Sequence, residues 1–116
     1  MQDGIVYVDQ AEGLKRVMQN TKVYVKILQK FKTDFKSKPD ELIAAVGAAD
    51  YGSAQILAHT LKGTAANLAL TELYKQSLEV ETQIKGGAVR PESLQNIKTC
   101  FNDTLLSIDT VLKQYG

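Results

Sequence analysis

The chain has 116 residues, of which 44% are hydrophobic, and it contains no long linker rich in Pro, Gly or Ser, so we expect one domain spanning residues 1–116 with a single core. Its 14 basic and 13 acidic residues give a formal net charge of +1, which excludes a global electrostatic attraction to nucleic acid or to an anionic membrane. The single cysteine, Cys100, excludes an internal disulfide and favours a reducing compartment.

The first predicted elements are a short apolar arm at residues 5–8 and a brief helix that is capped by Asp9 and ends near Asn20. We expect Thr21 to cap the next helix. Apolar side chains recur there at steps of three and four residues, with lysines on the opposite side. This apolar stripe consists of Tyr24, Leu28, Phe31 and Phe35.

A third, short helix is predicted to begin near Pro39, which suits the first helical position, and to end between Gly47 and Asp50. The fourth helix is expected over residues 51–69 and the fifth over residues 71–85. Because only about two residues connect these two helices, they should form an antiparallel hairpin.

The clearest break follows this hairpin, where Gly86 and Gly87 end one helix and Pro91 opens the last. The last helix is the longest, at roughly 24 residues of regular apolar periodicity. The sequence therefore predicts an all-α fold, an antiparallel four-helix bundle with one or two short additional helices at its N-terminal side.

The chain's only histidine, His59, lies in the fourth predicted helix. At about 100° per residue, its side chain points away from the stripe formed by Leu57, Leu61 and Leu68. The imidazole is therefore predicted to face solvent. One turn later stands Gly63, although a glycine inside a helix costs about 0.5 to 1 kcal/mol relative to alanine. Its missing side chain clears space beside the ring.

Other residues on the same face support a functional interpretation of this histidine. Ala66 extends the cleared surface by one turn, and Gln55 precedes His59 by one turn, so we expect both to contact a partner protein. A neutral imidazole is a nucleophile. If His59 accepts a phosphoryl group, about two negative charges appear, and the ammonium of Lys62 can screen them. We therefore assign phosphate stabilisation to Lys62 and access to the imidazole to Gly63.

The segment HTLKGTAANLA, residues 59–69, resembles the H-x-L-K-G-x-A-x-x-L-G motif of the histidine-containing phosphotransfer (HPt) domain. Residues 13–31 are similar to the opening helices of its bacterial members. One departure is Ala69, which stands where the family usually has glycine and affects the backbone of the hairpin more than the chemistry. The matching positions are His59, Leu61, Lys62, Gly63, Ala65 and Leu68.

The resemblance implies a helical bundle whose His59 accepts a phosphoryl group from the aspartyl phosphate of a response-regulator receiver domain and passes it to another receiver in a two-component phosphorelay. It implies a phosphoprotein carrier with a phosphohistidine intermediate and without ATP-dependent kinase activity of its own. No cofactor is expected, and Mg²⁺ would be bound by the receiver. The expected partners are receiver domains and a hybrid sensor histidine kinase.

The sequence also indicates where in the cell the protein is expected. It contains no apolar run of the roughly 18 residues that a membrane span requires, and its N-terminus lacks the pattern of a secretion signal. We expect a cytoplasmic monomer that contacts neither nucleic acid nor a membrane. It would be either a free-standing protein or the cytoplasmic C-terminal domain of a membrane sensor kinase.

The sequence has three other interpretations. In the first, the chain is a non-catalytic helical interaction module and His59 is incidental. In the second, it is the dimerisation segment of a histidine kinase, but such segments usually follow the histidine with an acidic residue, and Thr60 stands there. In the third, it binds metal. One histidine and one cysteine are too few ligands for a zinc site, so no metal site is expected.

Two features stay open at this point. Residues 22–38 contain six lysines and only one acidic residue, Asp34. Such a run is usually a solvated helix face, but the pattern also fits a membrane or nucleic-acid surface, or a surface that steers an acidic receiver. Gln83, on the helix paired with that of His59, could approach the site, but the register of the hairpin is not fixed by the sequence.

Overall fold

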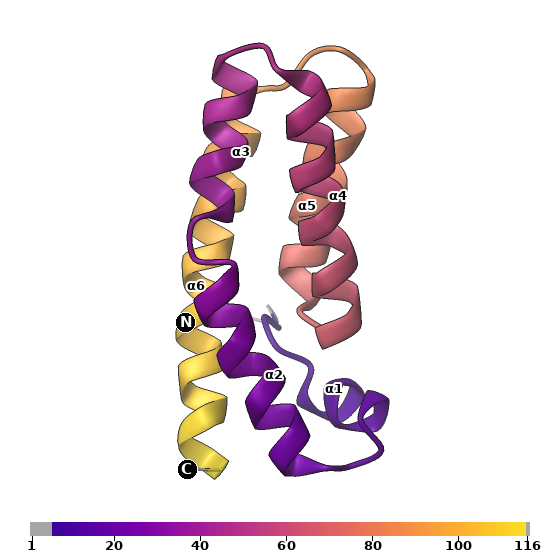
Figure 1. Ribbon diagram of the computed structural model, residues 1–116, viewed down its shortest axis with the longest axis vertical. Helices are drawn as coiled ribbons and strands as arrows, with labels where there is room; N and C mark the ends of the chain where they lie inside the picture. Colours follow the sequence, from indigo (N-terminus) through magenta and orange to yellow (C-terminus); the bar gives the residue numbers. More distant parts are fainter. Residues whose placement is uncertain (1–5, 116) are drawn as a thin grey trace.

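The computed structural model describes residues 6–115, and Ile5 of the predicted arm lies outside them. The described residues form six α-helices and no strand (Figure 1). The predicted all-α bundle is therefore confirmed. In chain order the helices are α1 (Gln10–Arg16), α2 (Thr21–Asp34), α3 (Lys38–Gly47), α4 (Tyr51–Leu68), α5 (Thr71–Lys85) and α6 (Pro91–Tyr115).

Four of these helices, α3 to α6, form the bundle, and each packs antiparallel to the next in the chain (Figure 1). The α2 helix continues the column of α3 and packs along α6. One side of the bundle is thus shared by two consecutive helices. The short α1 helix crosses the end of the bundle beside the C-terminal part of α4.

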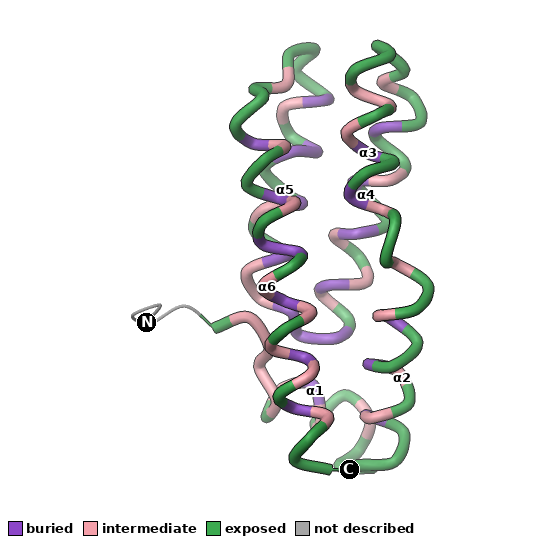
Figure 2. Tube along the Cα trace, turned by 90° about the vertical axis from the view of Figure 1, so that its left-hand side faces the viewer, coloured by how far each residue is buried: buried purple, intermediate pink, exposed green. Residues whose placement is uncertain are grey.

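The core lies between the inward faces of these helices, as Figure 2 shows by the buried segments that recur along each one. The stripe predicted for α4 is buried at Leu61 and Leu68, whereas Leu57 is half-buried. The stripe predicted for α2 is buried except for Phe35, which is half-buried after the helix ends. The large buried side chains include Tyr24, Leu28, Phe31, Leu42, Leu73, Val80, Ile97, Phe101 and Ile108.

Two helix ends differ from the prediction. Asn20, and not Thr21, caps α2, because its side-chain oxygen accepts a hydrogen bond from the backbone N–H of Val23 at 3.1 Å. Asp9 caps α1 as predicted, but α1 ends at Arg16. The next turn cannot continue the helix, because Met18 and Gln19 take left-handed backbone angles, φ 56° and 64°.

The hairpin of α4 and α5 turns at Ala69, which takes the left-handed conformation with φ 57° that glycine adopts most easily. The backbone carbonyl of Ala69 accepts a hydrogen bond from the N–H of Asp9 at 2.9 Å, and the hydroxyl of Thr71 donates to the carbonyl of Val6. The segment before α1 therefore holds the turn from outside. None of the helices within residues 6–115 has the length and apolar character needed to cross a membrane.

Candidate functional site

His59 lies on the outer face of α4, and its side chain is 67% exposed. This confirms the orientation predicted from the helical spacing, since Ala58 and Leu61, its neighbours on the inner face, are fully buried. The ring is therefore open to another macromolecule rather than enclosed by the bundle.

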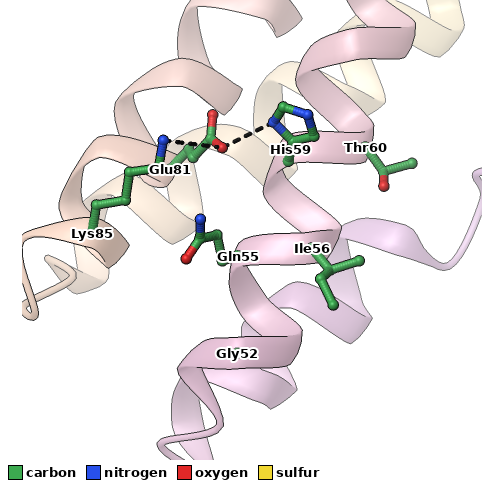
Figure 3. Close-up of a pocket in the computed structure, with 7 residues that line it drawn as sticks. All are labelled: Gly52, Gln55, Ile56, His59, Thr60, Glu81 and Lys85. Atoms are coloured by element: carbon green, nitrogen blue, oxygen red, sulfur yellow. Dashed lines mark hydrogen bonds and ion pairs between the residues drawn. The ribbon is translucent and has the colours of Figure 1, made fainter.

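A carboxylate from the paired helix holds one side of this ring. Oε2 of Glu81, on α5, lies 3.0 Å from Nδ1 of His59 (Figure 3). The antiparallel hairpin brings the two residues side by side. The Glu81 side chain is only 3% exposed, so the exposed imidazole contacts a buried carboxylate.

Two ammonium groups balance the charge of Glu81. Nζ of Lys62 lies 2.6 Å from Oε1, and Nζ of Lys85 lies 3.7 Å from Oε2. The pKa of Glu81 is lowered, chiefly by its contact with Lys62 and further by its contacts with His59 and Lys85, while burial opposes this shift. Glu81 is consequently an ionised acceptor at neutral pH.

The contact with Glu81 determines which ring nitrogen of His59 is protonated and which carries the lone pair. An ionised carboxylate can only accept hydrogen bonds, so the short contact assigns the ring proton to Nδ1 of His59. Figure 3 shows the other ring nitrogen, Nε2, pointing away from Glu81. In the neutral ring Nε2 then carries the lone pair. The arrangement presents an oriented nucleophile on an exposed surface.

A shallow hollow of about 410 Å³ lies beside the ring, and Gln55, Ile56 and Lys85 line it together with His59 (Figure 3). Gln55 therefore shares this hollow with His59, and its contact with a partner stays a prediction. Gly63 is exposed, and a Cβ built there would meet no atom within 4 Å. The fold itself does not need glycine at that position, and the surface beside the ring is clear.

Ala66 and Gln83, two further residues considered from the sequence, do not line the hollow beside His59. Ala66 is half-buried and lines a separate hollow together with Tyr74 of α5, so it does not share the hollow of His59. Gln83 does not approach His59. Its amide donates to Ser93 at 2.8 Å and its carbonyl accepts from the backbone of Arg90 at 2.9 Å. Gln83 therefore joins α5 to the start of α6.

Glu81 was missed by the sequence reasoning, although the sequence contains a signal for it. The buried stripe of α5 recurs at Leu73, Ser77, Val80 and Ile84, and Glu81 falls on that stripe. A charged residue on a buried face is almost always paired. Its position on this buried stripe could have marked it as part of a polar site.

The remaining features bring no further group to the site. No three His, Cys, Asp or Glu side chains within the described part of the chain gather as a metal site. Cys100 is buried, and this burial raises the pKa of its thiol to about 11.

In the lysine-rich segment, residues 22–38, Lys30 pairs with Asp34 at 2.8 Å and Lys32 pairs with Asp109. These pairs are typical of a solvated helix face.

Comparison with known families matches residues 26–109 to the Hpt domain, and this range includes α3, α4, α5 and most of α2 and α6. No curated protein and no solved structure is significantly similar to the chain. Hpt domains are helical bundles that interact with receiver domains. The matched range covers most of the sequence, and the chain therefore belongs to the Hpt domain family, which performs histidine phosphotransfer in phosphorelays.

Proposed function

We propose that His59 is the phosphoryl acceptor of this Hpt domain, taking the group from the aspartyl phosphate of one receiver domain and passing it to another. The observation that carries the proposal is the exposed ring whose Nδ1 is held by buried Glu81 at 3.0 Å. His59 is also the only histidine in the chain. A phosphohistidine relay therefore has one candidate acceptor.

In the transfer step the lone pair of Nε2 attacks the phosphorus in line with the bond to the aspartate oxygen. The N–P bond forms as the P–O bond breaks, and the receiver recovers its carboxylate. The proton on Nδ1 stays in place. Glu81 stabilises the positive charge that develops on the imidazole, because its carboxylate accepts that proton's hydrogen bond. Transfer to the second receiver is the same step in reverse.

The neighbouring residues are assigned roles that follow from their positions. Lys62 screens the phosphoryl oxygens from one turn along α4, and Gly63 leaves room for the receiver to bring its phosphoryl group in line. Gln55 contacts the receiver at the hollow beside His59, and Ala66 contacts it at the separate hollow that it lines together with Tyr74.

The proposal extends to the setting in which the domain works. The domain carries the phosphoryl group without ATP-dependent kinase activity of its own and uses no cofactor, since Mg²⁺ belongs to the receiver. We assign it to the cytoplasm as a monomer, either free-standing or as the C-terminal domain of a membrane sensor kinase. Its partners are response-regulator receiver domains and a hybrid sensor histidine kinase.

Incubation with a phosphorylated receiver domain tests the proposal. The wild-type chain should acquire an acid-labile phosphate, and His59→Gln should acquire none while keeping its helical circular dichroism. Labelling that persists in His59→Gln would refute the assignment. A wild-type chain that stays unlabelled with several receivers would favour the interaction-module interpretation. Labelling by ATP alone would favour a histidine-kinase segment.

A further inference from the structure

Glu81 has more cationic partners than one carboxylate needs. Lys62 contacts Oε1 and Lys85 contacts Oε2, the same oxygen that faces Nδ1 of His59. The two lysines differ in their surroundings. The Lys62 side chain is 22% exposed with its nitrogen at 2.6 Å, whereas the Lys85 side chain is 58% exposed with its nitrogen at 3.7 Å. One lysine is tightly engaged, and the other is loosely held at the rim.

This arrangement creates a conflict for Lys62. The proposed reaction requires its ammonium to approach a phosphoryl group on His59, yet the same ammonium already neutralises Glu81. Removing the partner of a buried carboxylate is strongly unfavourable, because the charge is left in a medium that solvates it poorly. Lys62 can leave only if another cation remains on Glu81.

We propose that Lys85 is a positioning residue that keeps Glu81 neutralised while Lys62 turns to the phosphoryl group on His59. The inference rests on the proposed function above and deepens it. Lys85 is one turn from Glu81 on the same helix, so it stays beside the carboxylate whatever occurs on α4. Its long, exposed side chain can shorten its contact with Glu81 without repacking the core.

Each anion then has a cationic partner both before and after transfer. Before transfer, Glu81 faces Lys62, Lys85 and the ring N–H of His59. After transfer, about two new negative charges lie on the phosphoryl group, and Lys62 pairs with them from three residues along α4. Glu81 keeps Lys85 and the ring N–H. Each anion retains a cation, and no proton has to move.

A small phosphodonor isolates this effect from partner docking. Phosphoramidate transfers its phosphoryl group to a histidine nitrogen and releases ammonia, and intact-mass spectrometry follows the labelling rate. Lys85→Gln should slow labelling of His59 by about fivefold, the size expected for one partly screened charge contact. Lys85→Arg should restore most of the rate. Lys113→Gln, which removes an exposed lysine from α6, is the matched control and should label at the wild-type rate.

A double-mutant cycle distinguishes this role from a merely structural one. If Lys85 acts by releasing Lys62, then Lys85→Gln should slow labelling much less in a Lys62→Gln background, because no cation remains to be released. Equal slowing in both backgrounds would overturn the inference. Urea unfolding of each variant shows that the compared proteins are folded at the assay temperature.

The outcomes also separate this inference from the proposed function. A wild-type chain that neither phosphoramidate nor phosphorylated receivers label at His59 would refute both. Wild-type labelling at His59, together with a Lys85→Gln rate equal to that of Lys113→Gln, would refute the role of Lys85 alone and leave the relay assignment intact.

Discussion

Glu81 is the residue on which the orientation of His59 depends, and its ionisation has a measurable consequence. The pKa of Glu81 is lowered from its ordinary value of 4.5, first by Lys62, while the same group in the unfolded chain keeps the ordinary value. A carboxyl whose pKa is lower in the folded state stabilises the fold above the unfolded value. That contribution is lost as the pH falls through the folded value.

We therefore predict that the difference in unfolding free energy between wild type and Glu81→Gln moves in favour of the wild type as the pH rises from about 3 to about 6. Urea unfolding at several pH values measures it. His59, Lys62 and Lys85 surround the carboxyl, so Glu81→Gln removes the one anion that all three contact. A difference that is constant across this pH range would contradict the ionised Glu81 described above.

Gly63 tests whether clear space beside the ring matters. A Cβ at this position meets nothing within 4 Å, so Gly63→Leu should keep the bundle folded, with a gain of about 0.5 to 1 kcal/mol from better helix propensity. Phosphotransfer from a receiver should nevertheless fall by at least about tenfold, because the new side chain obstructs in-line approach.

The matched control is Gly47→Leu, at an exposed helical glycine of α3 where a Cβ also meets nothing. It should leave the transfer rate unchanged. Transfer assays and thermal unfolding of both variants make the comparison. Unimpaired transfer in Gly63→Leu would remove the access argument.

The site residues that lie on one helix could be predicted from the sequence, and the residue contributed by the second helix could not. His59, Lys62 and Gly63 lie on one helix, so their common face follows from helical spacing. Glu81 is brought in by the register of α4 against α5, which local sequence does not determine. The engagement of Lys62 by Glu81 could not be predicted for the same reason.

At the scale of elements, α3 and α4 are each followed by an alanine with a strained backbone conformation. Ala49 and Ala69 follow these helices with φ 58° and 57°, a conformation that costs alanine about 1 to 2 kcal/mol. Glycine adopts it freely but loses more entropy on folding. Ala49 is the better test position, because it is exposed and its methyl group contributes little burial.

Ala49→Gly should therefore raise the unfolding free energy by about 0.5 to 1 kcal/mol. Ala44→Gly, at an exposed alanine inside α3, should lower it by a similar amount, because the backbone there is helical. Chemical denaturation of the two variants gives the comparison. Destabilisation by both substitutions to the same extent would rule out strain at residue 49.

Most element boundaries were predictable because their causes are local. Pro91 opens α6, Lys85 ends α5 before two glycines, and Asp9 caps α1. The end of α1 was not predictable, because no residue in the range 17–20 excludes a helix. There Met18 and Gln19 take left-handed angles as the chain turns into α2.

At the scale of the whole molecule, the sequence predicted a helical bundle but not how its first side is built. Apolar periodicity predicted α2, and Pro39 at a first helical position predicted α3 as a separate helix. It contained no information on whether they stack end to end along α6, which depends on side chains contributed by α6 (Figure 1). The class of fold was thus predictable from pattern, and the arrangement of helices was not.

We predict that the protein is a monomer at micromolar concentrations. Its large exposed apolar side chains are spread over the molecule, for example Met18 after α1, Ile56 on α4 and Leu106 on α6, rather than on one helix face. Size-exclusion chromatography with light scattering should give the mass of one chain. A stable dimer, especially one disrupted by Ile56→Ser, would mean that the face of His59 binds a second copy.

The central claim is that Glu81 reserves Nδ1 of His59 and leaves Nε2 to accept the phosphoryl group. Nitrogen–phosphorus correlation in the NMR spectrum of the ¹⁵N-labelled, phosphorylated protein tests it most directly. The account predicts a phosphoryl group bonded to Nε2 of His59, with Nδ1 still protonated. A phosphoryl group on Nδ1, or on any residue other than His59, would contradict it.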